Sequence, residues 1–285
     1  MIDLHAHTDR SDGSLAPAEL IALACRTGLQ TLSITDHDTV EGYDQAAPLA
    51  REAGLDLVCG VELGTKFHGH SIHLLGYFFQ ASPSEEFRSH LSCLQTSRRE
   101  RNGRLAARLR ELGLEVYREE AEQLGRSQTG RPHFARLLVD KGYVADIREA
   151  FDRYLDESAP GFVERRDPSL ENVVHWIHQA GGVVSWAHPV RMVRQSELGV
   201  ERLFREMADR GLDAIEAYHS DHGPQEQAEY LARAAQIGLA VTGGSDFHGD
   251  PKPQITLGSV RLPPECLAAL RSRRNGREYE SPAML

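Results

Sequence analysis

The sequence predicts an α/β fold in which seven strands close into a barrel, and three observations support that prediction. Short apolar runs of strand length recur along the chain, amphipathic helical stretches separate most of them, and polar residues with metal-binding side chains follow the runs. The runs cover residues 2–4, 31–34, 55–61, 71–79, 182–186, 212–217 and 239–242. This alternation predicts parallel strands joined by crossover helices. Because an open sheet gathers its ligands mainly at one crevice, ligands after nearly every run favour closure into a barrel.

The intervening stretches have the apolar spacing of helices that pack one face on a sheet. They cover residues 16–27, 40–53, 198–210 and 224–237. A glycine follows each of them, at positions 28, 54, 211 and 238, which is where helices commonly end. We interpret these stretches as crossover helices of the barrel.

The interval 81–167 interrupts the alternation, because it is rich in Arg and Glu and contains helical stretches without a strand between them. We predict an inserted helical cap subdomain there, with residues 1–80 and 168–285 forming the barrel. A turn over 81–84 and an Ala-Pro-Gly sequence at 159–161 mark its two ends. Insertions after barrel strands tend to cover the active face, so we expect this subdomain to select the substrate.

Composition argues against several classes of function. The chain of 285 residues carries a formal net charge of −10, which argues against a broad grip on long nucleic acid. A small anionic substrate stays compatible with that charge, since divalent ions clustered in one cleft would reverse its local sign. The sequence contains no apolar run long enough to span a membrane and no basic, apolar start typical of a signal peptide. The four scattered cysteines indicate a reducing cytoplasm as the location.

The first strand ends in two histidines that point in the same direction. His5 and His7 are two residues apart, and side chains alternate faces along a strand, so both rings are placed to bind one ion. Further imidazoles and carboxylates follow the other runs. The candidate metal ligands are His5, His7, Asp12, His37, Glu62, His73, His188, Asp246 and His248.

These ligands are too numerous for a single catalytic zinc ion, which takes about three protein ligands. We therefore predict two or three divalent ions, with Glu62 as a bridging carboxylate. Mixed imidazole and carboxylate ligands accept manganese, iron(II) or zinc, and we expect Mn²⁺ first. For any one histidine alone, a hydrogen-bonded core or surface role is the simpler explanation. Their recurrence at strand ends is what favours a metal centre.

Residues near the ligands are candidates for supporting roles. Asp36 and Asp38 flank His37, where they would either fix ring tautomers from outside the ligand shell or cap a turn. His219, at the end of the sixth run, would bind the substrate or protonate its leaving oxygen. Arg191 is a candidate for binding phosphate.

A substrate with two phosphates needs a second anion site, and the insertion offers one. Segment 127–133 is predicted to start a helix at which backbone N–H groups, Arg131 and His133 converge on a phosphate. The alternative is that Thr129 or Gly130 only starts a helix. A nearby arginine cluster is predicted to be a solvated helix face rather than a track for RNA. Its members are Arg98, Arg99, Arg101, Arg104, Arg108 and Arg110.

A series of motifs runs along the chain in a fixed order. They are His5 and His7, Thr35-Asp36-His37, Glu62, His73, His188-Pro189 and Asp246-Phe247-His248. In this order they resemble the pattern of the polymerase and histidinol phosphatase (PHP) superfamily. Three further segments, 12–14, 130–133 and 217–222, look most like its TrpH-like branch. That branch is similar to nucleoside 3′,5′-bisphosphate phosphatases and to a 5′-to-3′ exoribonuclease that acts on short RNA.

The resemblance implies a distorted (β/α)7 barrel, a trinuclear metal site and hydrolysis of phosphoesters. It implies one ion at His5, His7, Glu62 and Asp246, a second at Glu62, His73 and His188, and a third at Asp12, His37 and His248. Catalytic roles are expected for Asp246, His188 and His219, around a water that the ions activate for attack on phosphorus. The implied substrate is a small nucleotide, foremost the 3′-phosphate of nucleoside 3′,5′-bisphosphates, or short 5′-phosphorylated RNA.

Three other functions stay open. Hydrolysis of histidinol phosphate would use the same metal ions and differ only in the cap. An amidohydrolase often holds two ions with a carboxylated lysine at a strand end, and Lys66 is the one lysine near such a position. A non-catalytic, metal-binding accessory module would be expected to lose ligands, whereas no ligand of the pattern is missing in this sequence.

Overall fold

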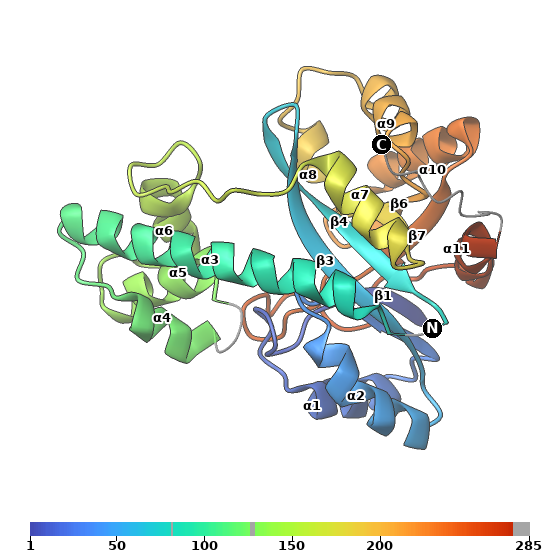
Figure 1. Cartoon of the computed structure of the whole chain (residues 1–285), viewed down its shortest axis with the longest axis horizontal. Helices are drawn as coiled ribbons and strands as arrows, with labels where there is room; N and C mark the ends of the chain where they lie inside the picture. The colour runs from blue at the N-terminus through green and yellow to red at the C-terminus, as the bar shows by residue number, and fades with distance from the viewer. Residues whose placement is uncertain (81, 126–128, 276–285) are drawn as a thin grey trace.

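The computed structural model describes residues 1–80, 82–125 and 129–275, and it confirms the predicted mixed α/β barrel. Its sheet contains β1 (Ile2–Ala6), β2 (Thr31–Ile34), β3 (Asp56–Phe67), β4 (His70–Phe78), β5 (Val183–Trp186), β6 (Ala214–His219) and β7 (Ala240–Gly244), in chain order. Beyond the ends of β1 and β7, the His7 N–H donates to the Phe247 carbonyl and the Asp246 N–H donates to the His5 carbonyl, each at 2.9 Å. The first and last strands therefore meet, and the barrel is nearly closed (Figure 1).

Strand β4 departs from the predicted parallel arrangement. It pairs antiparallel with β3 and β5, whereas the other adjacent pairs are parallel. Only His68 and Gly69 separate β3 from β4, and a parallel connection needs a crossover of about a dozen residues or more. Both residues have positive φ angles, 48° and 81°, as a tight hairpin turn of this kind requires. Parallel pairing throughout is thus a wrong expectation for β4, although the fold class is unaffected.

Helices cover the outside of the barrel, as the apolar spacing predicts (Figure 1). They are α1 (Pro17–Arg26), α2 (Glu41–Glu52), α7 (Leu170–Gln179), α8 (Val190–Val193), α9 (Val200–Asp209), α10 (Pro224–Ile237) and α11 (Pro264–Asn275). At the start of α10, Pro224 fills the first turn and Glu226 accepts a hydrogen bond of 2.8 Å from the Gly223 N–H. The helix ends at Gly238, whose φ of 73° favours glycine. None of the described helices is long and apolar enough to cross a membrane.

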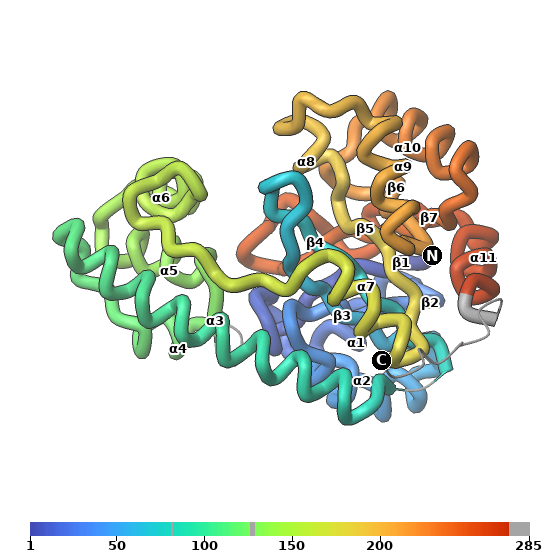
Figure 2. Tube along the Cα trace, turned by 45° about the horizontal axis from the view of Figure 1, so that its top comes forward, coloured from blue at the N-terminus to red at the C-terminus, as the bar shows by residue number. Residues whose placement is uncertain are grey.

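Between β4 and α7 the described residues form a helical lobe, which we call the cap. Its elements are α3 (Glu85–Glu111), α4 (Arg118–Gly125), α5 (Arg131–Asp140), α6 (Ile147–Ala150) and the π-helical turn η2 (Phe151–Leu155). The cap projects to one side of the barrel and has its own core, which includes the fully buried Phe134 and Leu138 (Figures 1 and 2). The bounds of the insertion stay a prediction. Residue 81 of the expected entry turn and the tail 276–285 lie outside the described residues.

Helix α3 belongs to both parts of the molecule. Near its start, Phe87, Leu91 and Leu94 pack in the barrel core. Further along, Leu105 and Leu109 pack in the cap core. One continuous helix of 27 residues therefore fixes the position of the cap beside the barrel (Figure 2).

Candidate metal centre

The ends of the strands bring the predicted ligands to one mouth of the barrel. His5 lies in β1 and His7 directly follows it, His188 comes after β5, and Asp246 and His248 come after β7. Parallel strands end at the same edge of a sheet, so these side chains converge there. Each of these residues is at most 5% exposed.

Four of the ligands form a first group. The Nε2 atoms of His5 and His7 lie 3.3 and 3.1 Å from Glu62 Oε2. Both Nε2 atoms also lie 3.4 Å from Asp246 Oδ1. All four residues offer donor atoms within 4.8 Å of one another. The structure thus brings together the set that the resemblance implies for the first ion.

A second group lies beside the first and shares His7 with it. Asp12 Oδ1 is 3.3 Å from His248 Nε2 and 3.5 Å from His7 Nδ1. The other oxygen of Asp12 is 3.6 Å from His37 Nε2. The set expected for the third ion, Asp12, His37 and His248, is therefore assembled as well, with His7 in addition.

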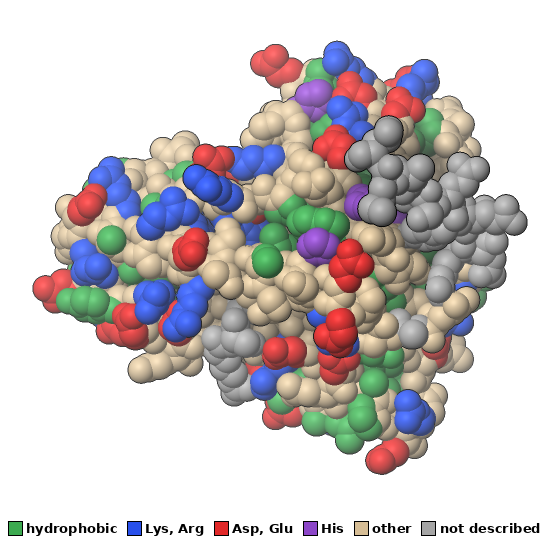
Figure 3. Space-filling view, viewed as in Figure 1, with side chains coloured by type: hydrophobic (Ala, Val, Ile, Leu, Met, Phe, Trp, Pro, Cys, Tyr) green, Lys and Arg blue, Asp and Glu red, His purple; other side chains and the backbone are tan. Residues whose placement is uncertain are grey.

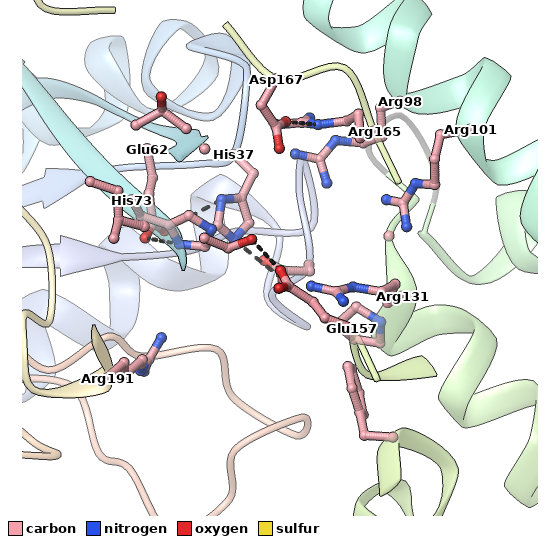
Figure 4. A pocket seen from close by; sticks show the side chains of 18 of the residues that line it. His37, Glu62, His73, Arg98, Arg101, Arg131, Glu157, Arg165, Asp167 and Arg191 are labelled. Carbon is pink, nitrogen blue, oxygen red and sulfur yellow. Dashed lines mark hydrogen bonds and ion pairs between the residues drawn. The ribbon is translucent and has the colours of Figure 1, made fainter. Parts of the chain in front are cut away.

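Glu62 joins a third group to the first. Its Oε1 lies 2.7 Å from His73 Nδ1 and 3.0 Å from His188 Nε2, while its Oε2 belongs to the first group. His37 Nδ1 is 3.4 Å from Oε2 and joins Glu62 and His73 as a possible ligand set (Figure 4). A carboxylate with imidazoles on both oxygens has the geometry of the bridging ligand that the sequence predicts.

The electrostatics of these groups ionise the carboxylates and keep His37 neutral, whereas at two other rings burial is outweighed by neighbouring carboxylates, which raise the pKa of His7 to about 9 and that of His5 well above its usual value. Burial raises the pKa of the Glu62 carboxyl, but the imidazoles of His37 and His73 outweigh burial and hold this pKa well below its usual value. The pKa of the Asp12 carboxyl is lowered against burial chiefly by His248 and His37, and that of the Asp246 carboxyl chiefly by Lys252 and then His5. Burial also lowers the pKa of the His37 ring to about 3, which keeps this imidazole neutral. Ionised carboxylates and neutral imidazoles are the forms that coordinate metal ions.

Two atoms of these groups are buried without a hydrogen-bond partner in the described part of the chain. They are His7 Nε2 and Asp12 Oδ1. Buried polar atoms left unpaired cost free energy, so such atoms call for a partner. Divalent cations are the partners that mixed imidazole and carboxylate donors accept, and the residues therefore fit the predicted ions.

Sequence reasoning misses Glu216, a fully buried carboxylate in β6. Its Oε1 lies 3.0 Å from His5 Nδ1, and its Oε2 accepts a hydrogen bond of 2.8 Å from the His188 N–H. By holding Nδ1, Glu216 turns Nε2 of His5 toward the first group. A charged residue between Ile215 and Ala217 in an apolar run was the available signal, because a buried carboxylate needs a partner.

Asp36 supports the metal ligands by hydrogen bonds to the loop after β1 and makes no direct hydrogen bond to a histidine ring in the described part of the chain. Its carboxylate accepts hydrogen bonds from the Thr8 N–H at 2.8 Å and from the Thr8 and Ser11 hydroxyls at 2.6 Å. Ser11 Oγ in turn lies 3.4 Å from His7 Nδ1. Asp36 thus fixes the loop that leads to Asp12, and it reaches a histidine ring only through Ser11.

Asp38 faces the cap instead of the metal ligands. Its fully buried Oδ2 accepts hydrogen bonds from Arg98 Nε at 2.9 Å and from an Arg165 nitrogen at 2.6 Å. Arg98 belongs to α3, and Arg165 belongs to the segment that returns from the cap to the barrel. The contacts of Asp38 with these arginines join the two parts of the molecule beside the metal centre.

Cations and an imidazole surround the outer side of Asp246. Its Oδ2 lies 2.8 Å from Arg191 and 2.7 Å from the Lys252 ammonium, a residue that sequence reasoning also misses. His219 Nε2 is 3.7 Å from the same oxygen. The Asp221 N–H donates to His219 Nδ1 at 3.0 Å, so the neutral ring carries its proton on Nε2, toward the centre.

A cleft of about 440 Å³ separates this mouth of the barrel from the cap. One wall carries Asp12, His37, Glu62, His73, Asp246 and His248. The opposite wall carries Arg98, Arg101, Arg131 and Arg165, which Figure 4 shows facing the metal-binding wall, and the lining also includes the carboxylates of Glu157, Glu164 and Asp167. On the outer surface of the cap, Lys and Arg side chains are interspersed with Asp and Glu side chains (Figure 3). The volume suits a small molecule, and the cap wall suits an anion.

The predicted second anion site around segment 127–133 is only partly assembled. Arg131 lines the cleft, whereas His133 is not among the lining residues. The Gly130 N–H, expected to be free for phosphate, donates to His133 Nδ1 at 3.0 Å and so closes the start of α5. Residues 127 and 128 lie outside the described residues.

Comparison with known proteins adds independent information. The chain matches the PHP domain family over residues 3–164. A 3′,5′-nucleoside bisphosphate phosphatase of Chromobacterium violaceum is 34% identical over 269 residues, covering 93% of both proteins. A 5′-3′ exoribonuclease of Haemophilus influenzae is 34% identical over 86% of this chain and 89% of its own length. A solved structure from Bifidobacterium adolescentis, described as a metal-dependent phosphoesterase, has a TM-score of 0.84 at 32% identity and covers 95% of this chain and 96% of its own.

Proposed function

This chain belongs to the PHP domain family and is a phosphoric ester hydrolase, and on that premise we propose that it removes the 3′-phosphate from nucleoside 3′,5′-bisphosphates. The observation that carries the proposal is the pairing of metal-binding groups around Glu62 with an arginine-lined wall across one cleft. Such a cleft has room for two phosphates, one at each wall. Short 5′-phosphorylated RNA is a second candidate substrate, because a relative of similar coverage is a 5′-3′ exoribonuclease.

We propose that the donor groups at the mouth of the barrel are the metal ligands and that Mn²⁺ is the ion that they bind. They are His5, His7, Asp12, His37, Glu62, His73, His188, Asp246 and His248. When bound, divalent ions at these groups lower the pKa of water and offset negative charge on phosphoryl oxygens. We keep the cytoplasm as the proposed location, because all four cysteines are free thiols.

Residues beside the ligands are assigned to the substrate. Arg191 and Lys252 line the cleft next to Asp246 and are placed to bind oxygens of the scissile phosphate. His219 directs its Nε2 proton toward the same place and is assigned to protonate the ribose oxygen that leaves. Asp246 and His188 orient the reacting centre through their contacts with the histidines and Glu62.

The charge of the cleft distinguishes this proposal from its alternatives. Histidinol phosphate has no second phosphate for the four arginines of the cap wall to bind, whereas a nucleoside bisphosphate has one. A non-catalytic accessory module would not be expected to keep all the ligands together, as this chain does. A nucleotide with a second phosphate therefore accounts for the arginines of the cap wall, and neither alternative does.

The test combines metal analysis with phosphate release from defined substrates. We expect the purified protein to hydrolyse adenosine 3′,5′-bisphosphate faster than histidinol phosphate, with a 5′-phosphorylated dinucleotide as the RNA probe. An Asp12→Asn variant, prepared in parallel, should lose bound metal and most activity, which excludes a contaminating phosphatase. Preference for histidinol phosphate, or metal binding without turnover of any phosphoester, would refute the proposal.

A further inference from the structure

Two arginines interrupt the apolar face of α3 where this helix crosses the cleft. Positions 87, 91, 94, 98, 101, 105 and 109 follow at intervals of three or four residues and share one face of the helix. All are buried apolar residues except Arg98 and Arg101. The apolar residues before them enter the barrel core, and those after them enter the cap core. Between the two cores, this face of α3 carries two guanidinium groups at positions where the spacing predicts apolar side chains.

Among the residues that the structure describes, Arg101 is buried without a charged partner. It is 6% exposed, its Nε makes no hydrogen bond, and no carboxylate within the described ranges forms an ion pair with it. Arg98 differs, because Asp38 accepts a hydrogen bond from its Nε. A buried guanidinium left unpaired destabilises a protein, so packing alone gives no reason for an arginine at position 101.

Other positive charges lie around Arg101. Arg98, Arg131 and Arg165 line the same cleft (Figure 4). Burial and the charges of these neighbours lower the pKa of Arg101 to about 9, so its guanidinium remains protonated at neutral pH. The carboxylate of Asp38 offsets part of the charge of Arg98 and Arg165. Asp167 and Glu157 also line the cleft and offset charge on Arg165 and Arg131, while Glu164 pairs with Lys66. The four guanidinium groups therefore exceed the three carboxylates Asp38, Asp167 and Glu157 by one charge.

Arg131 is oriented in advance on the same wall. It donates a hydrogen bond of 3.2 Å to the Leu155 carbonyl, and its Cζ lies 6.0 and 5.6 Å from the ring centres of Phe151 and Phe162. A guanidinium held by such contacts loses little side-chain entropy when it binds an anion.

We propose that Arg101, together with Arg98 and Arg131, binds the phosphate group of the substrate that is not hydrolysed. Guanidinium groups bind phosphate through paired, charge-assisted hydrogen bonds, and a phosphate dianion supplies the counter-charge that Arg101 otherwise lacks. The metal-binding wall holds the scissile phosphate on the other side of the cleft. The identity of the ligand rests on the proposed function, whereas the anion site rests on the burial and surroundings of Arg101.

The first test counts phosphate sites on the metal-loaded protein by isothermal titration calorimetry. The wild type should bind inorganic phosphate at a site on the metal wall and at a second site on the cap wall. Arg101→Met should retain only the site on the metal wall. Arg99→Met is the matched control, because Arg99 neighbours Arg101 on α3 but is 66% exposed and pairs with Glu122 at the surface. The control should bind phosphate like the wild type.

The second test separates binding from structural support. Removal of an unpaired buried charge should raise the melting temperature of Arg101→Met in the absence of phosphate. Its KM for adenosine 3′,5′-bisphosphate should rise about 10- to 100-fold, as expected for loss of a hydrogen bond to a charged group. Its kcat/KM should fall less for adenosine 3′-monophosphate than for the bisphosphate, because the monophosphate has no second phosphate. Arg101→Lys keeps the positive charge but loses the paired N–H donors of the guanidinium group. It should raise this KM in the same direction and by less, which provides a second variant if Arg101→Met fails to fold.

Two results would overturn the anion site. One is a wild type with a single phosphate site, and the other is an Arg101→Met variant that retains both sites. An equal loss of kcat/KM on both nucleotides, with a lower melting temperature, would identify Arg101 as a structural residue instead. If the wild type binds two phosphates but does not hydrolyse the bisphosphate, the proposed function fails while the anion site stands.

Discussion

Replacement of Asp38 by Asn measures how strongly the barrel and the cap are joined beside the metal centre. The Asp38 carboxylate is fully buried, and its partners Arg98 and Arg165 have side chains only 14% and 10% exposed. Asparagine keeps the shape of the side chain. It also tolerates the positive φ of 53° at this position, so the substitution removes little besides the charge.

The magnitude follows from the partners that remain. Breaking a buried ion pair costs about 3–5 kcal/mol, because the opposite charge is left uncompensated. In the variant Arg165 keeps Asp167 as a partner, so it is mainly Arg98 that loses its counter-charge. We therefore expect the free energy of unfolding to fall by about 3 kcal/mol, near the lower end of this range. The assay is the free energy of unfolding in urea. The matched control is Asp44→Asn, whose partner Arg88 lies 2.7 Å away at the surface, and its loss should stay below about 1 kcal/mol.

The pH dependence gives the same experiment a second readout. Burial raises the pKa of Asp38, but Arg98 and Arg165 outweigh burial and hold this pKa well below its ordinary value. A carboxyl with a lowered native pKa contributes stability that is complete above its unfolded pKa of about 3.9 and is lost as pH falls through the native value. The difference between wild type and Asp38→Asn should therefore be constant between about pH 5 and 8 and shrink below about pH 4. A neutral-pH difference as small as that of the Asp44→Asn control would refute the reasoning.

Three further changes test the metal centre. Chelation should abolish phosphate release and lower the melting temperature, and added Mn²⁺ should restore both, because the ions bind the folded chain; full activity after thorough chelation would contradict the assignment. Glu216→Gln should weaken metal binding by about 10- to 100-fold through looser orientation of His5, measured by metal retention during dialysis against a competing chelator; wild-type retention would remove Glu216 from that role. Gly42→Ala should lower the free energy of unfolding and the metal affinity, because a Cβ at residue 42 would lie 2.0 Å from Asp36 Oδ2 and disturb the loop that carries Asp12. Unchanged unfolding and metal content would show that this loop does not depend on Asp36.

The sequence reveals the ligands of the barrel because their signal is local. A side chain just beyond a strand end lies at the mouth of a barrel wherever the neighbouring strands are, and the alternation of His5 and His7 fixes their common direction. The antiparallel direction of β4 was harder to predict, because its turn, His68-Gly69, lacks the Asn-Gly or Asp-Gly pair typical of tight hairpins. Two neighbouring apolar runs then resemble successive strands of a parallel barrel.

Long-range charge pairs left no comparable signal in the sequence. Asp38 stands 60 residues before Arg98 and 127 before Arg165, and nothing in their local patterns shows that they meet. In α3, the sequence does not distinguish the inward-facing Arg98 and Arg101 from the other arginines of the helix. Arg99, with a side chain 66% exposed, fits the predicted solvated face, whereas Arg98 and Arg101 lie on the face that turns inward, so that prediction is wrong for these two. Only knowledge of both cores shows which face of α3 is buried.

The architecture divides the chemistry between two structural units. The barrel fixes the metal-binding groups through backbone positions at strand ends, which leaves little freedom to vary them without loss of the centre. The cap contributes its charges from the face of a helix, where we expect one substitution to change the ligand that is recognised and to leave the barrel intact. Since Asp38 and α3 hold the cap wall across the cleft, we expect the spacing of the two walls to select substrates by the separation of their anionic groups. Specificity in this chain should therefore respond to substitutions at Arg98, Arg101 and Arg131, and the hydrolytic step to substitutions in the barrel.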